Sequence, residues 1–291
     1  MCIRDRWQHE ASHKWGHDKL QFIERSDLPQ WVASERYQAG LFDPEGGHLN
    51  PLKLALGLAD AIERAGGHIH EQSKALSYGE EGDGFVVTTE RGRIRADVLV
   101  LACNAYLDRL DPQLASCVLP VGTYQVATAP LTTEQATALL PSNVCVTDNQ
   151  FVLDYFRRTP DNRLLFGGGC TYLGGMPKDI AAATRPFLER VFPQLTGVEL
   201  EFAWGGHIDL TLKRTPDIGR RGDLYWMQGY SGHGVLPTLA AARAVSDAVL
   251  GQPDELSLYQ GLDNGSFPGG KYLAAPLEAI GKAWYRLRDS I

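Results

Sequence analysis

The pattern of apolar residues changes twice along the chain, and these changes constrain the fold more than any other feature of the sequence. The run at residues 98–102 is continuously apolar, which is typical of a strand covered on both faces in a parallel sheet. After Pro120 and up to about Thr211, short segments alternate apolar with polar residues, as in an antiparallel sheet with one wet face. After Asp223 a strand pattern leads into a glycine-rich turn and a helix pattern, so the sequence again resembles a parallel α/β sheet.

These changes predict a mixed α/β fold, α+β in part, with two domains interleaved in the sequence. We expect residues 18–119 and 212–291 to form one α/β domain around a parallel sheet. Residues 120–211 then form an antiparallel-sheet domain, which residues 31–50 also contact. A chain of 291 residues has the length of two domains.

The clearest helix pattern covers residues 48–65, where apolar residues fall along one side. Asn50 suits the N-cap, Pro51 the first turn and Gly66 the end of this helix. Further helix patterns cover about 18–31, 179–192 and 235–250. Segments of strand length cover 68–78, 85–92 and 93–104.

Composition excludes several classes of function. The formal net charge of −7 and the pI near 5.6 provide no attractive field for a phosphate backbone, so we expect no nucleic-acid partner. No window approaches 18 consecutive apolar residues, and we therefore expect no membrane span. Five cysteines, odd in number and without C-x-x-C spacing, fit a reducing cytoplasm: Cys2, Cys103, Cys117, Cys145 and Cys170.

Two motif matches lack the context that their chemistry needs. Residues 9–13 read H-E-x-x-H, the spacing of a zinc protease, but no apolar face accompanies them and Lys19 stands where an extended zinc motif has a histidine. Residues 265–271 mimic a phosphate loop, but Tyr272 follows where Mg²⁺ binding needs Ser or Thr. We interpret both as ordinary surface segments and predict no metal site.

The segment G-Y-S-G-H-G at residues 229–234 has the right context for a ligand. A strand pattern leads into three glycines and a helix start, so backbone N–H groups and the positive end of the helix dipole converge there. Glycines permit close approach of an anionic or electron-rich group. A tight strand-to-helix turn without a ligand explains the pattern equally well.

Two aromatic positions in the alternating region also remain open. Alternation places Phe151, Leu153 and Tyr155 on one side of a strand. Such a stripe forms either part of the core or the wall of a substrate cavity. Trp204 precedes two glycines inside a strand pattern, which indicates a bulge or a close backbone approach.

Several segments together resemble a known family. The stretches at residues 46–66, 97–107, 155–169, 204–220 and 229–242 are similar to the FAD-dependent amine and amino-acid oxidases of the D-amino-acid oxidase superfamily. The likeness is greatest to the branch that oxidises gamma-glutamylputrescine. The resemblance covers the chain from about Asp18 onward, and G-Y-S-G-H-G and R-T-P-D-I-G-R are its most specific parts.

The resemblance implies a fold and a cofactor site. It implies that the α/β part is an FAD-binding, Rossmann-like domain and that the antiparallel part is the substrate domain. Ala75 corresponds to backbone beside the adenine, and Ala102 and Cys103 lie near the pyrophosphate or ribose. The residues that line the isoalloxazine ring are Gly232, His233, Gly234, Val235 and Leu236.

The family's dinucleotide motif has no counterpart here. Its members begin with a strand, a G-x-G-x-x-G turn and a helix that hold the FAD pyrophosphate, and this sequence contains no G-x-G-x-x-G. The resemblance therefore implies a chain that lacks the first βαβ unit of the FAD domain. We expect such a chain to bind FAD weakly and to expose an apolar edge and face that this unit would cover.

Other departures from the family pattern bear on attachment and substrate. Leu210 stands near the place where some relatives attach flavin through a cysteine, so FAD should be non-covalent. Amino-acid oxidases hold the substrate carboxylate through a cation, but His207, Ile208 and Leu236 occupy those positions. An amine without an adjacent carboxylate is the expected substrate, since an unpaired buried charge is costly.

The function implied is FAD-dependent oxidative deamination of a gamma-glutamylputrescine-like amine, with O₂ as acceptor and H₂O₂ as product. Tyr155 is the candidate for the substrate cavity and His233 for the flavin side. One alternative is a non-catalytic fragment of such an oxidase. Another is an amino-acid oxidase of the glycine or sarcosine type.

Overall fold

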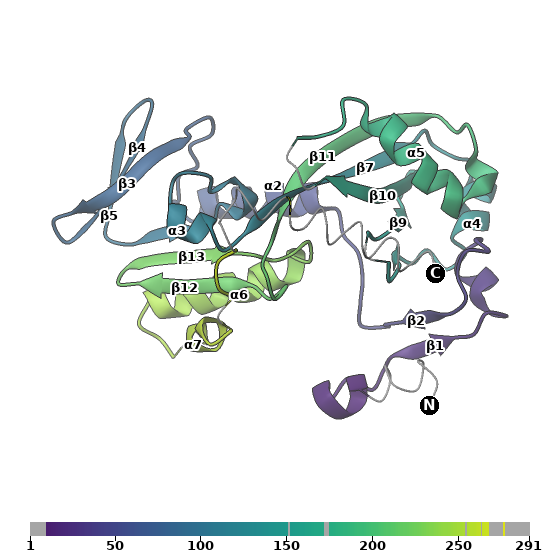
Figure 1. Cartoon of the computed structure of the whole chain (residues 1–291), viewed down its shortest axis with the longest axis horizontal. Helices are drawn as coiled ribbons and strands as arrows, with labels where there is room; N and C mark the ends of the chain where they lie inside the picture. The colour runs from purple at the N-terminus through teal and green to yellow at the C-terminus, as the bar shows by residue number, and fades with distance from the viewer. Residues whose placement is uncertain are drawn as a thin grey trace. The chain divides into compact units, whose positions relative to one another are not determined.

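The computed structural model describes residues 10–150, 152–171, 175–253, 255–262, 264–267 and 276. The chain forms two compact units that are interleaved in sequence (Figure 1). The first unit comprises Met1–Leu49, Thr123–Cys170 and Met176–Gly205. The second comprises Asn50–Gly122, Thr171–Gly175 and Gly206–Ile291. The expected division into a flavin part and a substrate part stays a prediction.

A five-stranded sheet, in the order β11-β7-β10-β9-β8, forms the centre of the first unit. Strand β9 runs antiparallel to both β8 and β10, as the alternating pattern after Pro120 predicts. None of these strands joins β6 in one sheet. The strands are β7 (Leu119–Thr128), β8 (Val146–Thr147), β9 (Tyr155–Arg158), β10 (Leu164–Thr171) and β11 (Leu200–Leu210).

The core of the first unit lies on one face of this sheet. Phe156 stacks on Phe166 with ring centroids 5.8 Å apart and meets Phe192 edge to face at 4.9 Å. Helix α5 (Ile180–Val191) supplies Leu188 and Val191 to the same cluster. Its predicted bounds are confirmed, and the Asp179 side chain accepts the N–H of Ala182 as an N-cap. Helix α4 (Thr133–Leu139) adds Leu139.

The helix expected at 18–31 is wrong. This segment contains strand β1 (Gln21–Ile23), paired antiparallel with β2 (Gly40–Phe42), and the short 3₁₀ helix η1 (Leu28–Gln30). The strand pairing joins residues far apart in sequence, which a local periodicity does not reveal.

A three-stranded sheet, in the order β12-β13-β6, lies in the second unit. Strand β13 (Leu224–Gln228) runs parallel to β6 (Leu99–Leu101) and antiparallel to β12 (Asp217–Arg221). The parallel character is confirmed. The expectation that residues 98–102 are covered on both faces is wrong, because β6 is an edge strand of the described sheet and Val100 is 40% exposed.

Helix α6 (Val235–Val249) packs on this sheet within the bounds expected. Ala241 and Val245 share a buried cluster with Ile218 of β12 and Tyr225 of β13, and Leu256 of α7 (Leu256–Gln260) completes it. These contacts fix the direction in which the helix leaves the sheet, and thereby the position of its first turn.

A second three-stranded sheet in this unit is antiparallel, in the order β3-β4-β5. Its strands are β3 (Ala75–Glu81), β4 (Gly84–Thr89) and β5 (Arg93–Ala96). The strand expected from residue 68 therefore begins only at Ala75, and residues 68–70 belong to no described strand. Beyond β6 the chain forms η2 (Asn104–Tyr106) and the short helix α3 (Pro112–Ala115).

Helix α2 (Pro51–Arg64) is confirmed with its predicted cap, since the Asn50 side chain accepts the N–H of Lys53 at 3.0 Å. Its packing differs from that of α6, because none of its residues is buried. Leu52, on its apolar side, is 66% exposed. An amphipathic helix normally buries that side, so α2 presents an apolar face without a partner in the described structure.

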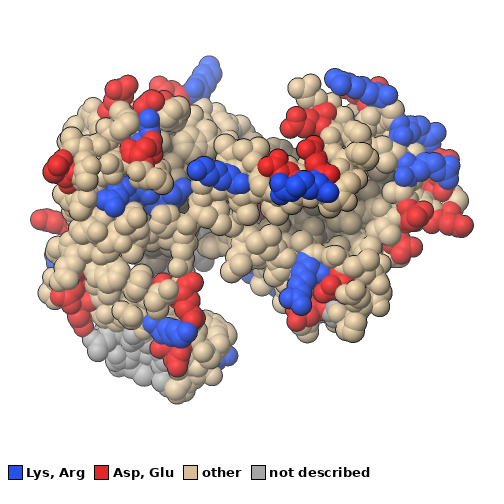
Figure 2. Space-filling model, turned by 180° about the vertical axis from the view of Figure 1, so that it is seen from behind, with Lys and Arg blue, Asp and Glu red and all other residues tan. Residues whose placement is uncertain are grey.

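Charged side chains of both signs are interspersed over the face seen in Figure 2. No described helix is long and apolar enough to cross a membrane. The described residues also contain no group of three or more His, Cys, Asp or Glu that would hold a metal ion. His9 and most of residues 265–271 lie outside the described residues. The described cysteines that carry free thiols are Cys103, Cys117, Cys145 and Cys170.

Candidate functional site

The ends of two parallel strands define the candidate site in the second unit. Leu101 of β6 lies opposite Trp226 of β13 in parallel register. Ala102 and Cys103, which follow β6, therefore lie at the same sheet edge as the turn at 229–234, which follows β13. Ligands of open α/β sheets bind outside this carboxyl edge. The structure thus brings two of the sequence-predicted segments together.

The turn at 229–234 has a conformation that depends on glycine. Gly229 and Gly232 have φ values of +79° and +87°, and Ser231 lies between them at +53°. Gly232 is exposed, and a Cβ atom there would lie 3.3 Å from Ile208 Cδ1. The turn therefore presents bare backbone at its surface.

Helix α6 begins directly after this turn. Gly234 is its N-cap and provides no side-chain hydrogen bond, so the first N–H groups of the helix are available to a ligand. Val235 is exposed, and Leu236 is 75% exposed. The helix dipole adds positive potential at this end. The arrangement suits an electron-rich or anionic group that approaches the backbone.

His233 is an exposed part of the same turn. Its N–H donates to the Tyr230 carbonyl at 3.0 Å, and its Nδ1 atom lies 3.3 Å from the Ser231 carbonyl. When Nδ1 carries a proton, this contact holds the ring against the turn. The catalytic role expected for His233 stays a prediction.

Cys103 and Tyr106 follow β6 closely in the sequence. Burial raises the pKa of the half-buried Cys103 thiol, which keeps it protonated and unreactive at neutral pH. The Tyr106 hydroxyl accepts the N–H of His207 at 3.3 Å, and the two rings meet edge to face with centroids 5.9 Å apart. The sequence interpretation missed Tyr106, because only the fold brings residue 207 beside it.

Asp209 is a second residue that sequence reasoning missed. It lies in β11 between the apolar residues Ile208 and Leu210, and its carboxylate is buried beneath the turn. Burial raises its pKa despite backbone hydrogen bonds that favour the charged form. An acid inside an apolar strand was the only local signal, and it does not identify the turn as the partner.

Ala75 is the half-buried first residue of β3, in the other sheet of the second unit. The two sheets share a core, in which Tyr78 and Phe85 pack with Leu101 and Cys103. The structure therefore connects the β3 sheet to the candidate edge through this core. The contact of Ala75 with adenine remains an expectation of the family resemblance.

Tyr155 belongs to the first unit, where it begins β9 opposite Gly167 of β10. Its hydroxyl is hydrogen-bonded to the Gln125 side chain, and burial raises its pKa. It alternates with the buried Phe156 and so occupies the sheet face opposite the core. The stripe expected at 151–155 is wrong in one respect, because Leu153 precedes the strand; Phe151 lies outside the described residues.

The two glycines after Trp204 lie within β11, and the first marks a close backbone approach. A Cβ atom at Gly205 would come 2.9 Å from the Thr123 carbonyl oxygen of β7. The close backbone approach, one of the two alternatives that the sequence left open, is therefore confirmed at Gly205.

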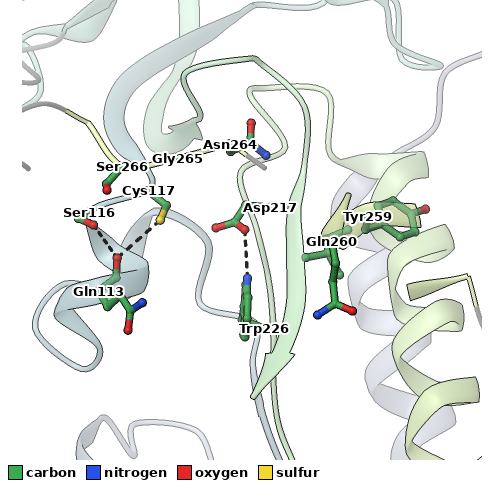
Figure 3. A pocket seen from close by; sticks show the side chains of 11 residues that line it. Gln113, Ser116, Cys117, Asp217, Trp226, Tyr259, Gln260, Asn264, Gly265 and Ser266 are labelled. Carbon is green, nitrogen blue, oxygen red and sulfur yellow. Dashed lines mark hydrogen bonds between the residues drawn. The ribbon is translucent and has the colours of Figure 1, made fainter. Parts of the chain in front are cut away.

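A cavity of about 290 Å³ lies elsewhere in the second unit (Figure 3). The Asp217 carboxylate on its wall accepts hydrogen bonds from Trp226 Nε1 at 3.1 Å and Gln228 Nε2 at 2.8 Å. Cys117 and Asn264 face the same space. None of the sequence-predicted site residues lines this cavity, although Asp217 on its wall lies beside Gly229 of the turn.

A parallel sheet edge with a glycine turn at a helix start is typical of dinucleotide-binding proteins. The chain belongs to the DAO family of FAD-dependent oxidoreductases, whose family model matches residues 3–248. The family expected from the sequence is confirmed.

Two relatives illustrate the similarity. Gamma-glutamylputrescine oxidoreductase of Escherichia coli (strain K12) is 40% identical over 286 residues, which cover 98% of this chain and 67% of the relative. A probable oxidoreductase, OrdL, of Haemophilus influenzae is 37% identical over 96% of this chain and 65% of its own length. The chain thus spans about two thirds of the length of these relatives.

Solved structures show the same fold. Glycine oxidase from Geobacillus kaustophilus superposes with a TM-score of 0.73 at 23% identity, covering 88% of this chain and 70% of the other. L-proline dehydrogenase from P. horikoshii gives a TM-score of 0.71 at 19% identity, covering 86% and 70%. At these identities the likeness concerns the fold alone.

Proposed function

We propose that the chain forms the flavin-facing part of an FAD-dependent amine oxidoreductase. The observation that carries this proposal is the left-handed turn at 229–232, which leads into the start of α6 at the carboxyl edge of a parallel pair of strands. Family membership supplies the cofactor class. The residues present fit the group, because exposed glycine backbone and helix N–H groups suit a flat, electron-rich ring.

Gly232, His233, Gly234, Val235 and Leu236 are the residues we assign to the ring, with Ala102, Cys103 and Ala75 along the rest of the cofactor. These residues would hold FAD, which when bound would supply a hydride acceptor for the carbon that carries the amine. The N-terminal end of α6 stabilises negative charge on a group bound there, through the helix dipole and the first N–H groups of the helix. The protonated Cys103 thiol adds no competing charge.

We propose a neutral amine of the gamma-glutamylputrescine type as substrate. The support is the name of the E. coli relative and the absence of Lys and Arg at positions 207, 208 and 236, which are His207, Ile208 and Leu236. Lys213 stands close in sequence to these positions, but its Nζ atom donates to the Leu262 carbonyl at 3.0 Å. A substrate carboxylate there would lack the fixed cation that its burial requires.

Tyr155 is the side chain that we assign to the substrate. Its hydroxyl is fixed by Gln125, and its ring rests on Gly167, so the sheet holds it rigid. A rigid aromatic side chain of this kind suits the wall of a substrate cavity, where it would orient the amine. We further propose molecular oxygen as electron acceptor, with H₂O₂ as product, and a reducing cytoplasm as the location.

The experiment is a panel of substrates with the purified chain supplied with FAD. H₂O₂ release and substrate loss are followed for gamma-glutamylputrescine, a simple diamine, glycine, sarcosine and a D-amino acid. We expect the diamine conjugate to give the highest kcat/KM. An equal kcat/KM for sarcosine or glycine would instead support an amino-acid oxidase. Substrate loss only after a dye is added as artificial electron acceptor, with no H₂O₂ release in its absence, would indicate an acceptor other than O₂.

A second candidate is a chain without catalysis of its own. Helix α2 buries none of its residues, and about one third of the E. coli relative lies outside the part that this chain matches. A chain of this kind would bind no FAD, and it would show no flavin absorbance after incubation with FAD and gel filtration. Retained flavin bands would exclude this candidate.

A further inference from the structure

Asp209 lies beneath the turn that precedes α6, and it is only 1% exposed. Its Oδ2 atom accepts the N–H of Gly229 at 2.5 Å, and the carboxylate also accepts the N–H of Tyr230. Its backbone carbonyl accepts the N–H of Ser231 at 2.9 Å. One residue of β11 thus binds three consecutive residues of the turn.

The conformation that these bonds hold is a strained one. Three of the four residues at 229–232 have positive φ values, and one of them is Ser231, a non-glycine residue. Such a backbone persists only where surrounding contacts determine it. Thr211 adds two of these contacts: its N–H donates to Ser231 Oγ at 3.3 Å, and its Cγ2 atom fills the space that a side chain at Gly229 would need.

A buried carboxylate is an unfavourable way to stabilise a fold. Burial, and secondarily the charge of Asp217, raise the pKa of Asp209, so the charged form is penalised there. An apolar side chain would avoid this penalty. No uncharged aliphatic residue would accept two backbone N–H groups at once, and this is what the carboxylate contributes to the turn.

We infer that Asp209 is a positioning residue: it holds the turn at 229–232 and thereby sets where Gly232 and the first N–H groups of α6 face a ligand. The inference rests on the proposed function for the identity of that ligand. Asp209 acts through the turn, and its contacts with Gly229, Tyr230 and Ser231 require no contact with FAD.

The first test is hydrogen exchange of the full chain, followed by mass spectrometry. In Asp209→Ala we expect peptides covering 229–235 to exchange at least tenfold faster, because local opening becomes easier. Asp209→Asn keeps the shape and one acceptor oxygen, and should show a smaller acceleration in a folded chain. The matched control is Asp111→Asn, another buried acid of this unit, which accepts the N–H groups of Gln113 and Leu114.

The control should loosen residues 112–115 and leave 229–235 unchanged. Unchanged exchange at 229–235 in both Asp209 variants would overturn the inference.

The second test is titration of the same proteins with FAD, followed by flavin fluorescence and by the shape of the visible absorption bands. Asp209→Asn should weaken FAD binding at least tenfold and alter the band shape, with Asp111→Asn like the wild type. A loosened turn with unchanged FAD affinity would overturn the positioning role. If the wild type binds no FAD but the turn loosens as expected, the FAD assignment fails while the hold of Asp209 on the turn stands.

Discussion

The ring of Tyr155 occupies the space that a side chain at Gly167 would need. The two residues face each other across β9 and β10, and a Cβ atom on Gly167 would fall within contact of ring atoms Cε2 and Cζ and of the hydroxyl. The absence of a side chain at 167 therefore lets the ring lie across β10 toward Gln125 on β7. Gly167 thus makes room for an aromatic residue of the neighbouring strand.

Gly167→Ala should destabilise the first unit by roughly 1–3 kcal/mol, because the added methyl forces Tyr155 from its place. It should also break the hydrogen bond between Tyr155 and Gln125. Urea unfolding measures the free energy. The control is Gly79→Ala in β3, where no atom lies within 4 Å of the added Cβ. Equal stability of the wild type and Gly167→Ala would contradict the packing.

The buried side chain of Asp154 predicts that the free energy of unfolding of the first unit depends on pH. It is 0% exposed, and burial raises its pKa although Arg190 donates to its Oδ2 atom at 2.7 Å. A carboxyl group whose folded pKa is raised contributes stability below its unfolded pKa, and this contribution is lost as the pH rises through the folded pKa. The free energy of unfolding of the wild type minus that of Asp154→Asn should therefore fall as the pH rises from about 4.

Denaturant unfolding of both proteins at a series of pH values tests this sign. A difference that rises with pH would mean that hydrogen bonding to the charged form outweighs burial.

We expect the exposed apolar face of α2 to promote self-association of the chain. We expect it to contribute little to the free energy of unfolding. Leu52→Glu combined with Leu56→Glu should change the free energy of unfolding by less than about 0.5 kcal/mol, since neither side chain is buried. It should reduce self-association in sedimentation velocity, because an exposed apolar patch is lost. As the control, Leu188→Glu should unfold the first unit, where Leu188 is fully buried.

A large loss of stability in the double variant would instead show that α2 packs on other parts of the chain.

Elements with local signals could be predicted from the sequence. Helix α2 has its cap in Asn50 and its first turn in Pro51, and α6 follows a glycine turn, so the residues that begin each helix are neighbours in sequence. The continuous apolar run at 98–102 predicted a strand of a parallel sheet, and β6 does pair in parallel, although its partner β13 was not predicted. The family resemblance located the turn at 229–234 for the same reason, since its specific residues are contiguous.

Features that depend on distant residues could not be predicted. Strand β1 exists because it pairs with β2, and its own periodicity resembled a helix. The hydrogen bond from the Gly229 N–H to the Asp209 carboxylate joins positions 20 residues apart. The family resemblance predicted an exposed apolar edge and face, and β6 and α2 are exposed, but no pattern within these two segments identifies the partner that would cover them.

The most direct test of the proposed cofactor site is FAD binding by the purified chain and two glycine variants, measured by quenching of flavin fluorescence. Gly232→Val places a branched side chain at φ +87° in the turn, and Gly222→Val does so at φ +57° in the β12–β13 turn. Both variants place a branched side chain at a positive φ that disfavours it, but only the first alters the proposed site. We expect saturable binding to the wild type and to Gly222→Val, and binding at least tenfold weaker to Gly232→Val. Equal FAD affinity of Gly232→Val and the wild type would contradict the assignment of this turn to the flavin.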